Sequence, residues 1–380
     1  MKRILIYDTS IEGHHMEYLH HIYMATDGVN AKFVFAIPDR FQSLKDKMKW
    51  PVRQNVTFDL IPELELSKTN GGYFKERWNK ARLAAKYIRK HEADEVFYLE
   101  LVVQFPFLPL FAPKDVKVSG ILYRLVPYEW KRLSLITKIK DAIEVNVIGR
   151  SKLVKAPMCL NDNSCACYYN KLFKTNKFIP VVDPIKPLNY QPKSIRKDLG
   201  AGTNDKIILH FGGMTMRKGT LTLLEAACSM SEDQLKSKVF VFAGKVGNDI
   251  KAQFDRYISE LQAKCRVVKY EGFCAYELLA DLCYSCDCIV VPYRNTSYSS
   301  GVIGDAAQYQ KTVVGPGDGL LGKLIRRNRL GITMKENKPA ALVAILVRAE
   351  AYLLRPNNYS QKETVEVFSK TVIETLTRQF

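Results

Sequence analysis

The chemistry of this sequence concentrates in a stretch of small polar residues and one acid that follows a buried, strand-like run. Residues 296–311 read TSYSSGVIGDAAQYQK and come directly after CIVVPYR. Serine and glycine at the start of a helix leave backbone N–H groups open, and such groups bind anions. Ser299, Ser300 and Gly301 precede the predicted helix, and Asp305 lies about one turn inside it. The pattern predicts an anion site with a single carboxylate beside it.

A second cluster carries two cations where a helix begins. In HFGGMTMRKGTLTLLEA the pair Gly212 and Gly213 ends a strand, and Arg217 and Lys218 precede an amphipathic helix. Positive charge at a helix N-terminus opposes the helix dipole, which favours an anion there. A bound diphosphate would resolve the conflict, because Arg offers a bidentate fork and Lys a point charge. The alternative is an exposed basic turn, and the spacing is not that of a Walker phosphate loop.

Three further strand ends carry candidate residues. KRILIYD ends at Asp8, and a loop through Gly13 leads to His14 at the start of a helix. Histidine can act as acid, base or hydrogen-bond donor near neutral pH, although His14 and its neighbour His15 could equally be solvated first-turn residues. FAGK and YEGF place glycines after two other strands, the second followed by Phe273. At Gly244 and Gly272, structural turns and ligand contacts are both open readings.

The elements that position these residues alternate along the chain. Short apolar runs such as KFVFAIP, VTFDLIP, KIILHFGG and VFVFAGKV are separated by helical patterns, which is typical of parallel sheets covered on both faces. A Pro-rich polar stretch at 184–197 predicts a linker. We therefore expect an N-terminal Rossmann-like domain over 1–190, a C-terminal one over 191–357, and a C-terminal helix over 358–380 that packs back toward the first domain. The last two helices are expected at 339–354 and 359–376.

Composition narrows the class of protein. The 380 residues are 47% hydrophobic and carry a net charge of +18, which favours anionic partners. No aromatic stacking platform accompanies the basic residues, so no nucleic-acid partner is expected. The nine cysteines are expected to be reduced core residues, and Cys283, Cys286 and Cys288 lack the spacing of a metal site. The chain opens directly on a strand, so we expect no secretory signal and a cytoplasmic protein.

Two segments raise the question of a membrane. Residues 101–113, LVVQFPFLPLFAP, fall short of the about 20 apolar residues that span a bilayer. They read as a buried strand with a Pro-rich loop, or as a loop that dips into a membrane surface. Residues 128–143 form a helical pattern with apolar Trp130, Leu133, Ile136 and Ile139 among basic residues. This is either a solvated basic face over a packed stripe or a helix that lies on an anionic bilayer.

The ordered set FGG, RKGTLTLLEA, VFAGK, YEGF and CDCIVVPYR…SSGVIGDAAQYQKTVV resembles the C-terminal domain of GT-B-fold glycosyltransferases of the family 4 type, the glycosyl transferases group 1. The resemblance covers about residues 206–333, and the N-terminal half is similar in layout and in its Gly13–His14 loop. It implies an α/β fold with the GT-B architecture, in which two Rossmann-like doubly wound domains face each other across a cleft. The order of the motifs is specific, whereas no single motif is.

The resemblance also implies roles for individual residues. Arg217 and Lys218 would bind the donor diphosphate and its leaving-group charge, and His14 would donate to the sugar or the acceptor. Asp305 stands where the family has the second acid of its Glu-x7-Glu pair, whereas the first acid falls at Ser297 and is missing. The remaining donor-binding positions would be Gly13, Gly212, Gly213, Gly272, Phe273, Ser299, Ser300, Gly301, Val302 and Ile303.

The resemblance implies a retaining glycosyltransferase, and we expect it to need neither a metal ion nor a cofactor. Its partners would be a nucleotide-diphosphate sugar and a glycan or lipid-linked acceptor, with an anionic membrane surface at the inner face of the membrane as a further candidate, and its role surface polysaccharide synthesis. The missing acid at Ser297 leaves donor identity open. It also keeps open a catalytically inactive relative that binds nucleotide or glycan. A nucleotide-sugar epimerase of similar build is the third reading.

Overall fold

A computed structural model describes residues 1–186 and 190–378, with the backbone alone at 46–48. The chain divides into two compact units, and it passes from one to the other twice. Unit 1 comprises Met1–Val182 and Val365–Phe380, and unit 2 comprises Asp183–Thr364. The divisions expected after residues 190 and 357 both fall inside unit 2, and residues 187–189 of the expected linker lie outside the described residues.

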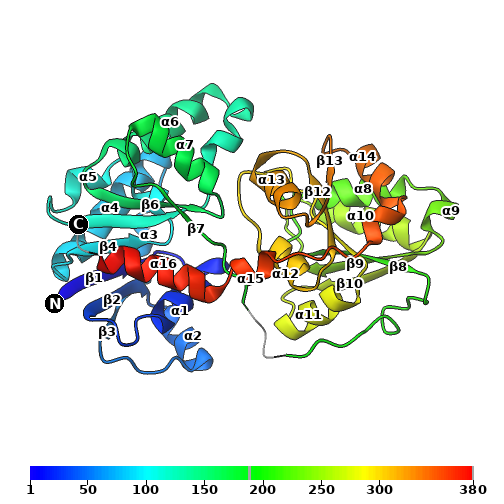
Figure 1. The fold of residues 1–380 in the computed structure, drawn as a ribbon, viewed down its shortest axis with the longest axis horizontal. Coiled ribbons are helices and arrows are strands. Elements are labelled where there is room, and N and C mark those ends of the chain that lie inside the picture. The colour runs from blue at the N-terminus through cyan, green and yellow to red at the C-terminus, as the bar shows by residue number, and fades with distance from the viewer. Residues whose placement is uncertain (187–189, 379–380) are drawn as a thin grey trace. The chain divides into compact units, whose positions relative to one another are not determined.

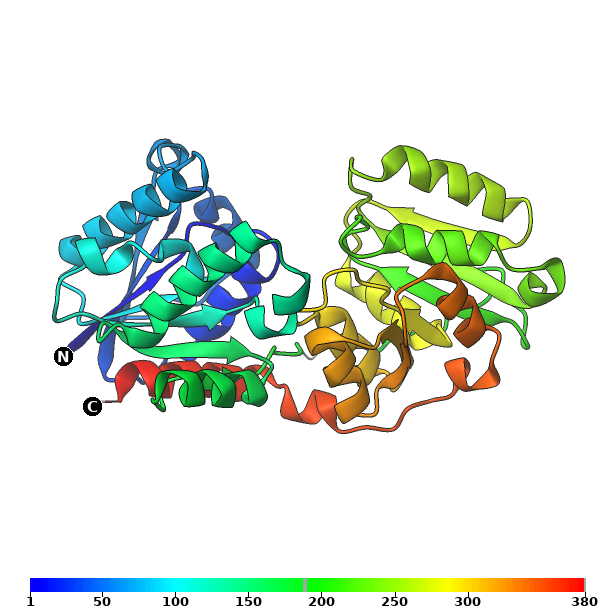
Figure 2. The ribbon, with the colours of Figure 1, turned by 90° about the horizontal axis from the view of Figure 1, so that it is seen from above.

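Unit 1 is built on one parallel sheet of seven strands in the order β3-β2-β1-β4-β5-β6-β7. The central strand β1 is apolar on both faces, with Ile4, Leu5 and Ile6 fully buried, because helices cover both sides of the sheet (Figures 1 and 2). The strands are β1 (Lys2–Tyr7), β2 (Ala31–Pro38), β3 (Val56–Ile61), β4 (Glu95–Tyr98), β5 (Lys117–Leu122), β6 (Val154–Leu160) and β7 (Ile179–Val181).

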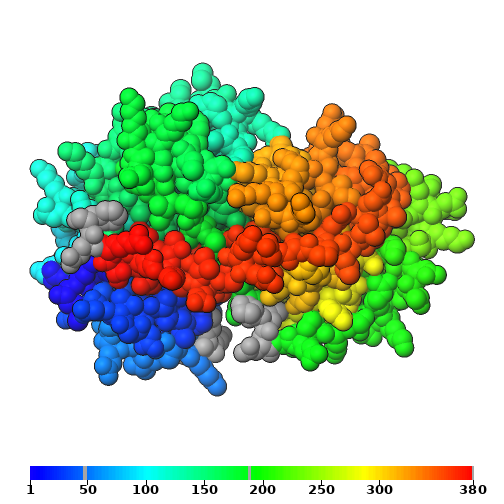
Figure 3. All heavy atoms as spheres, viewed as in Figure 1, coloured from blue at the N-terminus to red at the C-terminus, as the bar shows by residue number. Residues whose placement is uncertain are grey.

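The helices of unit 1 include one that follows all of unit 2 in the chain. Helix α16 (Val365–Thr377) buries Phe368, Val372 and Leu376 in the same core as helix α1 (His14–Met24). In the space-filling view, α16 lies between the blue N-terminal surface and the green surface that contains α7 (Figure 3). The other helices are α2 (Phe41–Met48), α3 (Glu63–Ser67), α4 (Tyr73–Lys90), α5 (Leu108–Phe111), α6 (Leu135–Arg150) and α7 (Asn163–Phe173), with short 3₁₀ turns η1 (Leu101–Gln104), η2 (Val126–Tyr128) and η3 (Trp130–Arg132).

Unit 2 repeats the design with a parallel sheet of six strands in the order β10-β9-β8-β11-β12-β13. In both units the first strand pairs with the second on one side and the fourth on the other, so the order reverses beside the first strand. Ligands of open α/β sheets bind at the carboxyl ends of the strands at such a reversal. The strands are β8 (Lys206–Phe211), β9 (Lys238–Gly244), β10 (Arg266–Glu271), β11 (Cys288–Val290), β12 (Thr312–Pro316) and β13 (Gly331–Met334).

The helices of unit 2 pack mainly through small and aliphatic residues. Helix α8 (Thr220–Cys228) is almost entirely buried, because α10 and α14 both contact it. The other helices are α9 (Glu232–Leu235), α10 (Lys251–Gln262), α11 (Tyr276–Ser285), α12 (Gly301–Gln308), α13 (Gly319–Arg327), α14 (Pro339–Leu346), the 3₁₀ turn η4 (Ala349–Tyr352) and α15 (Tyr359–Lys362).

Three sequence-based expectations about elements are wrong. Residues 101–113 contain η1 and α5 and no strand, because their three prolines cannot donate to a sheet ladder. The helix expected over 339–354 ends at Leu346. The helix expected over 359–376 breaks between α15 and α16, where Ile185 pairs with Thr364 and its N–H donates to the Glu363 carbonyl at 2.7 Å.

The segment 128–143 is also not one helix. It contains the last residue of η2 and all of η3. Helix α6 begins only after Ser134, whose hydroxyl caps it by accepting from the Thr137 N–H at 3.3 Å. The cysteines are free thiols, and Cys283, Cys286 and Cys288 are buried as expected, whereas Cys167 is exposed. Burial raises the pKa of the Cys286 thiol to about 12.

Candidate functional site

Open backbone marks the carboxyl edge of the unit 2 sheet. Gly212 and Gly272 directly follow β8 and β10, and Gly244 is the last residue of β9 between them; each has a positive φ, at 96°, 100° and 139° respectively. At Gly212, Gly213 and Gly272 an added Cβ would meet no atom within 4 Å, so the backbone there faces open space. At Gly244 it would lie 2.0 Å from the Gly212 carbonyl oxygen, so this glycine is required for packing. Of the two strand ends that the sequence left open, Gly244 is therefore structural.

The two loops at the strand-order reversal are joined directly. The Arg294 N–H, after β11, donates to the Arg217 carbonyl, after β8, at 3.0 Å. The Lys218 ammonium donates to the Tyr293 hydroxyl at 2.7 Å and lies 4.1 Å from the centre of its ring. That hydroxyl also lies 3.2 Å from the Ser300 hydroxyl. The structure thus joins Lys218 to Ser300 through a tyrosine that the sequence did not single out. Arg217 is tied to the same loop by its backbone carbonyl, and its side chain is exposed.

Helix α12 begins at the end of this chain of contacts. Its N-cap is Ser300, whose side chain makes no capping hydrogen bond to the helix. Gly301 is the first helical residue, and the side chains of Val302 and Ile303 are buried, so these two positions can offer only backbone to a ligand. Asp305 lies about one turn into the helix, as the sequence predicted, and its side chain is partly exposed.

Ser297 occupies the position of the missing acid, and it is fully buried. Its N–H and hydroxyl both donate to the Asn295 side-chain oxygen, at 3.1 and 3.0 Å. The neighbouring Thr296 carbonyl accepts from the N–H groups of Leu320 and Leu321, at 2.7 and 3.2 Å. This loop is therefore folded on itself against the start of α13, and the Ser297 side chain is committed to it.

The nucleobase position predicted at the end of β10 is exposed. Phe273 is 91% exposed, directly after the open Gly272. An exposed aromatic ring beside open backbone is suited to stacking on a planar group.

A buried histidine fixes the two loops relative to each other. His210 lies at the end of β8, with Nδ1 2.9 Å from the Val290 carbonyl of β11 and Nε2 3.0 Å from the hydroxyl of Thr220, the first residue of α8. Since a carbonyl only accepts, Nδ1 carries the proton and Nε2 accepts from Thr220. Burial lowers the pKa of His210 to about 4 and keeps the ring neutral. The sequence does not indicate the role of His210, because a histidine inside an apolar strand gives no signal of its partners.

We expect His210→Leu to lower the free energy of unfolding by about 1–3 kcal/mol, because both partners lose a buried hydrogen bond. Between pH 6.5 and 4 the unfolded chain binds a proton that the folded protein excludes, so the wild type loses stability as pH falls through this window. The His210→Leu variant should not show this loss of stability between pH 6.5 and 4. Thermal unfolding from pH 4 to 8 measures it, with Thr220→Val as a matched control that removes only one partner. Parallel profiles for wild type and His210→Leu would contradict the assignment.

At the carboxyl edge of the unit 1 sheet, His14 and His15 lie in different environments. His14 is 59% exposed, and its Nδ1 lies 3.9 Å from a Glu17 oxygen. His15 is mostly buried, and its Nδ1 lies 2.6 Å from Asp8 Oδ2. Burial lowers the pKa of His15, but the Asp8 hydrogen bond and charge outweigh it, so the net shift is upward. The better-oriented acid–base group is therefore His15. The position of Asp8 directly after β1 is the sequence signal that could have pointed to this pair.

Across residues 1–186 and 190–378, no three His, Cys, Asp or Glu side chains gather as a metal site would require. Among the helices that the structure describes, none is long and apolar enough to cross a bilayer.

The two parallel sheets with their shared strand order define the class of the chain, which has the GT-B fold of glycosyltransferase structures. Residues 205–350 match the family model of the glycosyl transferases group 1, the segment that carries the glycine and cation loops. This agrees with the resemblance over 206–333. No curated protein matches the sequence.

Solved structures extend the similarity over nearly the whole chain. HepE from Anabaena in complex with UDP-glucose superposes with a TM-score of 0.69 and 17% identity, covering 99% of this chain and 100% of that one. WaaG, a glycosyltransferase involved in lipopolysaccharide biosynthesis, gives 0.68 and 14%, covering 99% and 100%. The UDP-GlcNAc 2-epimerase from Methanocaldococcus jannaschii gives 0.61 and 12%, covering 98% and 99%. At these identities the likeness establishes the fold.

Proposed function

We propose that this protein is a retaining glycosyltransferase that moves a sugar from a nucleotide-diphosphate donor to a glycan or lipid-linked acceptor in surface polysaccharide synthesis. The observation that carries the proposal is the junction of the Arg217–Lys218 loop with the start of α12 at the strand-order reversal of unit 2. Two neighbouring glycines there leave backbone open to a ligand. The match of 205–350 to the group 1 family and the UDP-glucose held by HepE support a nucleotide-sugar donor.

In the proposed reaction the bond between the sugar and the diphosphate breaks, and the electron pair leaves with the diphosphate oxygen. Arg217 and Lys218 would neutralise this developing charge, and the backbone N–H groups of Gly301 and Val302 at the start of α12 would stabilise it further. The Tyr293 hydroxyl accepts from Lys218 and so holds the ammonium in place. The proposed mechanism requires no cofactor or metal ion, because Arg217 and Lys218 would supply the positive charge. In unit 1, His14 and the Asp8–His15 pair are the groups that we propose for the acceptor side.

Different residues of unit 2 would contact the different parts of the donor. Gly212, Gly213 and the backbone of residues 301–303 would contact the diphosphate, and Asp305 the ribose. Phe273 and Gly272 would flank the base. Ser297 replaces an acid that would contact the sugar, and its hydroxyl is bonded to Asn295. We therefore propose that the sugar is recognised without a carboxylate at this position, and that the donor preference differs from that of relatives with the full acid pair.

The test is turnover and binding across a panel of nucleotide sugars, with Arg217→Ala and Lys218→Ala. Each variant is expected to lower turnover of the preferred donor by about 100-fold or more, because each removes a charge aimed at the leaving group. Donor binding undiminished in both would contradict the diphosphate assignment. Binding without turnover of any donor would favour the inactive relative, and a changed sugar without acceptor would favour an epimerase.

We propose that the protein associates peripherally with the inner, cytoplasmic face of the membrane. Helix α6 and the turn before it support this location, because their apolar residues are exposed and the acids of α6 are buried. The apolar stripe of 128–143 is not packed, which corrects the reading of a solvated face over a packed stripe. Trp130, Leu135, Ile136, Ile139 and Ile143 are between 41% and 73% exposed. The acids of the same helix, Asp141 and Glu144, are buried and bonded to Arg124 and Arg77. Exposed aliphatic residues among Lys131, Arg132, Lys138 and Lys140 are suited to an anionic bilayer.

We expect Ile136→Glu with Ile139→Glu to weaken binding to vesicles that contain anionic lipid by at least about tenfold, because each change removes apolar area and adds repulsion. Both residues are exposed, so the fold should persist. Co-sedimentation at low salt measures the effect. Leu172→Glu, an exposed leucine on α7, is the matched control. Equal sedimentation of the double variant and the wild type would remove α6 from the membrane surface.

A further inference from the structure

A basic cavity lies at the amino edge of the unit 1 sheet, where the strands begin. It measures about 810 Å³ and is lined from β1, β4, β5, β6, the start of β7 and the end of α16. The loops proposed for the acceptor side follow the opposite, carboxyl ends of these strands. Strand β5 runs from Lys117 to Leu122, which separates the two edges by roughly 17 Å at 3.3–3.4 Å per residue. The cavity is therefore a separate feature from the proposed active site.

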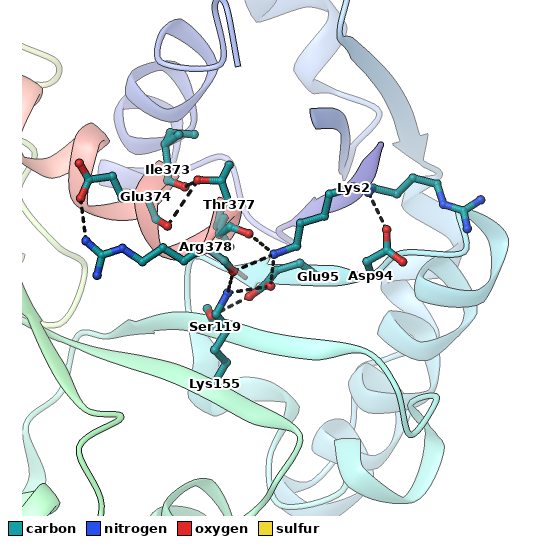
Figure 4. A network of polar contacts seen from close by, with 11 residues as sticks. Lys2, Asp94, Glu95, Ser119, Lys155, Ile373, Glu374, Thr377 and Arg378 are labelled. Carbon is teal, nitrogen blue, oxygen red and sulfur yellow. Dashed lines mark hydrogen bonds and ion pairs between the residues drawn. The ribbon is translucent and has the colours of Figure 1, made fainter. Parts of the chain in front are cut away.

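Two lysines of the cavity lining, Lys2 and Lys155, stabilise the fold of unit 1 (Figure 4). The ammonium groups of Lys2 and Lys155 converge on the same buried carboxylate oxygen, Glu95 Oε2, at 2.9 and 3.0 Å. Both also donate to carbonyls at the end of α16, Lys2 to that of Leu376 and Lys155 to that of Arg378. These two lysines close the C-terminal end of the helix, where the dipole favours cations. The Arg378 guanidinium pairs instead with Glu374.

Three lysines of the lining remain without a carboxylate. Lys117 and Lys152 have no hydrogen-bond or ion-pair partner for their ammonium groups among the described residues. The Lys177 ammonium donates to three carbonyls, those of Ile148, Ser151 and Val154, at 2.8, 3.0 and 3.3 Å. Burial lowers its pKa to about 8, and no acid counters that effect.

The acids of the lining are already engaged. Glu95 accepts from Lys2, Lys155 and the Ser119 hydroxyl. Asp94 Oδ2 accepts from the backbone N–H of Arg3 at 2.7 Å. The register sets Glu95 beside Lys117 on adjacent strands, so the uncompensated lysine lies next to a carboxylate already shared by two other cations. The lining therefore holds an excess of positive charge that the fold itself does not use.

We propose that this cavity binds a soluble, multiply charged phosphate anion, held by Lys117 and Lys152 with Asn176 as a further polar group, while Lys177, whose three donors are taken by carbonyls, contributes only its charge. Lysines are compact point charges with three donors each and suit phosphate oxygens approached from several sides. Among the described residues of the lining, the only apolar side chains are Ala156 and Ile179, so a free anion fits better than a lipid headgroup with its chains. The volume accommodates a ligand larger than one phosphate.

Inorganic pyrophosphate is the probe, and lysine acetylation followed by mass spectrometry locates it. Increasing pyrophosphate is expected to protect Lys117 and Lys152, and not Lys114 or Lys171, which are exposed in unit 1 outside the cavity. The readout is specific to each lysine, which matters because pyrophosphate also resembles the diphosphate proposed at Lys218. Protection confined to Lys218 would overturn the phosphate site in the unit 1 cavity, while supporting the donor diphosphate site at Lys218.

A variant measures the affinity of the cavity itself. In Lys117→Gln, the pyrophosphate concentration that half-protects Lys152 should rise about tenfold, since one charge-assisted contact is lost. Lys114→Gln, which removes the same charge outside the cavity, should leave it unchanged. Lys117 has no side-chain partner to lose, so its substitution leaves the fold intact, which circular dichroism can check. Equal half-protection in all three proteins, or no protection of Lys152 in the wild type, would overturn the proposal. Vesicles of phosphatidic acid that protect Lys152 where pyrophosphate does not would also overturn it, in favour of a lipid headgroup.

Discussion

Replacing Gly219 with alanine is expected to lower the free energy of unfolding by about 2–5 kcal/mol, through positive-φ strain and overpacking. Gly219 has a φ of 67°, and an added Cβ would lie 1.8 Å from the backbone carbonyl oxygen of Pro292. The clash can be relieved only if the backbone of Gly219 or of Pro292 shifts, and such a shift would move the loop that carries Arg217 and Lys218. We therefore also expect donor affinity to fall by at least about 100-fold, because a small displacement of charged groups is costly at such sites.

Gly213→Ala separates packing from ligand binding in this experiment. An added Cβ at Gly213 meets nothing within 4 Å, and its φ is not positive. Its stability should match the wild type, whereas donor affinity should fall if the diphosphate lies over this glycine. Gly72→Ala, equally open and in unit 1, should change neither quantity. Chemical denaturation and donor titration give both readings. A Gly219→Ala protein as stable as the wild type would contradict the close approach to Pro292.

Replacing Glu363 with glutamine is expected to stabilise the protein, and only at higher pH. Burial raises the pKa of Glu363 from 4.5 to about 7, and the charge of Asp183 adds to the shift. Between pH 4.5 and 7 the folded protein keeps a proton that the unfolded chain has released, so the free energy of unfolding falls as pH rises. Glutamine removes this cost. The gain should be about 1–3 kcal/mol above pH 7 and vanish near pH 4.5.

Denaturant unfolding at pH 4.5, 6 and 8 tests this dependence. Glu366→Gln is the matched control, because that residue is three positions further on and exposed. It removes the same charge without relieving a buried carboxylate, so it should shift stability little at any pH. A gain for Glu363→Gln that is constant with pH would show that its carboxyl group is ionised normally.

Much of the fold could be predicted, because apolar runs at strand length and helical patterns alternate along the whole chain. The strands containing KIILHF and KFVFAI lie where the sequence put them. Boundaries set by distant partners could not be predicted. The break between α15 and α16 depends on Ile185, far away in the chain, which takes the Glu363 carbonyl and pairs with Thr364.

The candidate site was predictable where a residue's chemistry conflicts with its local position. Two cations at a helix start pointed to Arg217 and Lys218, and small residues pointed to the start of α12. The partners that orient them were not visible, because Tyr293 and His210 look like ordinary residues of apolar strands. The exposure of α6 was equally hidden, since an apolar stripe looks the same whether it faces a core or the solvent. The structure shows that the apolar side of α6 faces the solvent, because Asp141 and Glu144 are the residues that it buries.

The place of α16 has a consequence for how the protein is made. Unit 2 is continuous in the chain, so it can complete its core as soon as its own residues have left the ribosome. Unit 1 cannot, because Phe368, Val372 and Leu376 of its core follow the whole of unit 2. During synthesis, α1 and the first sheet must wait with an uncovered apolar face, and partly folded chains of this kind are prone to aggregate. Expression of residues 1–182 alone should therefore give a less soluble product than expression of residues 183–364.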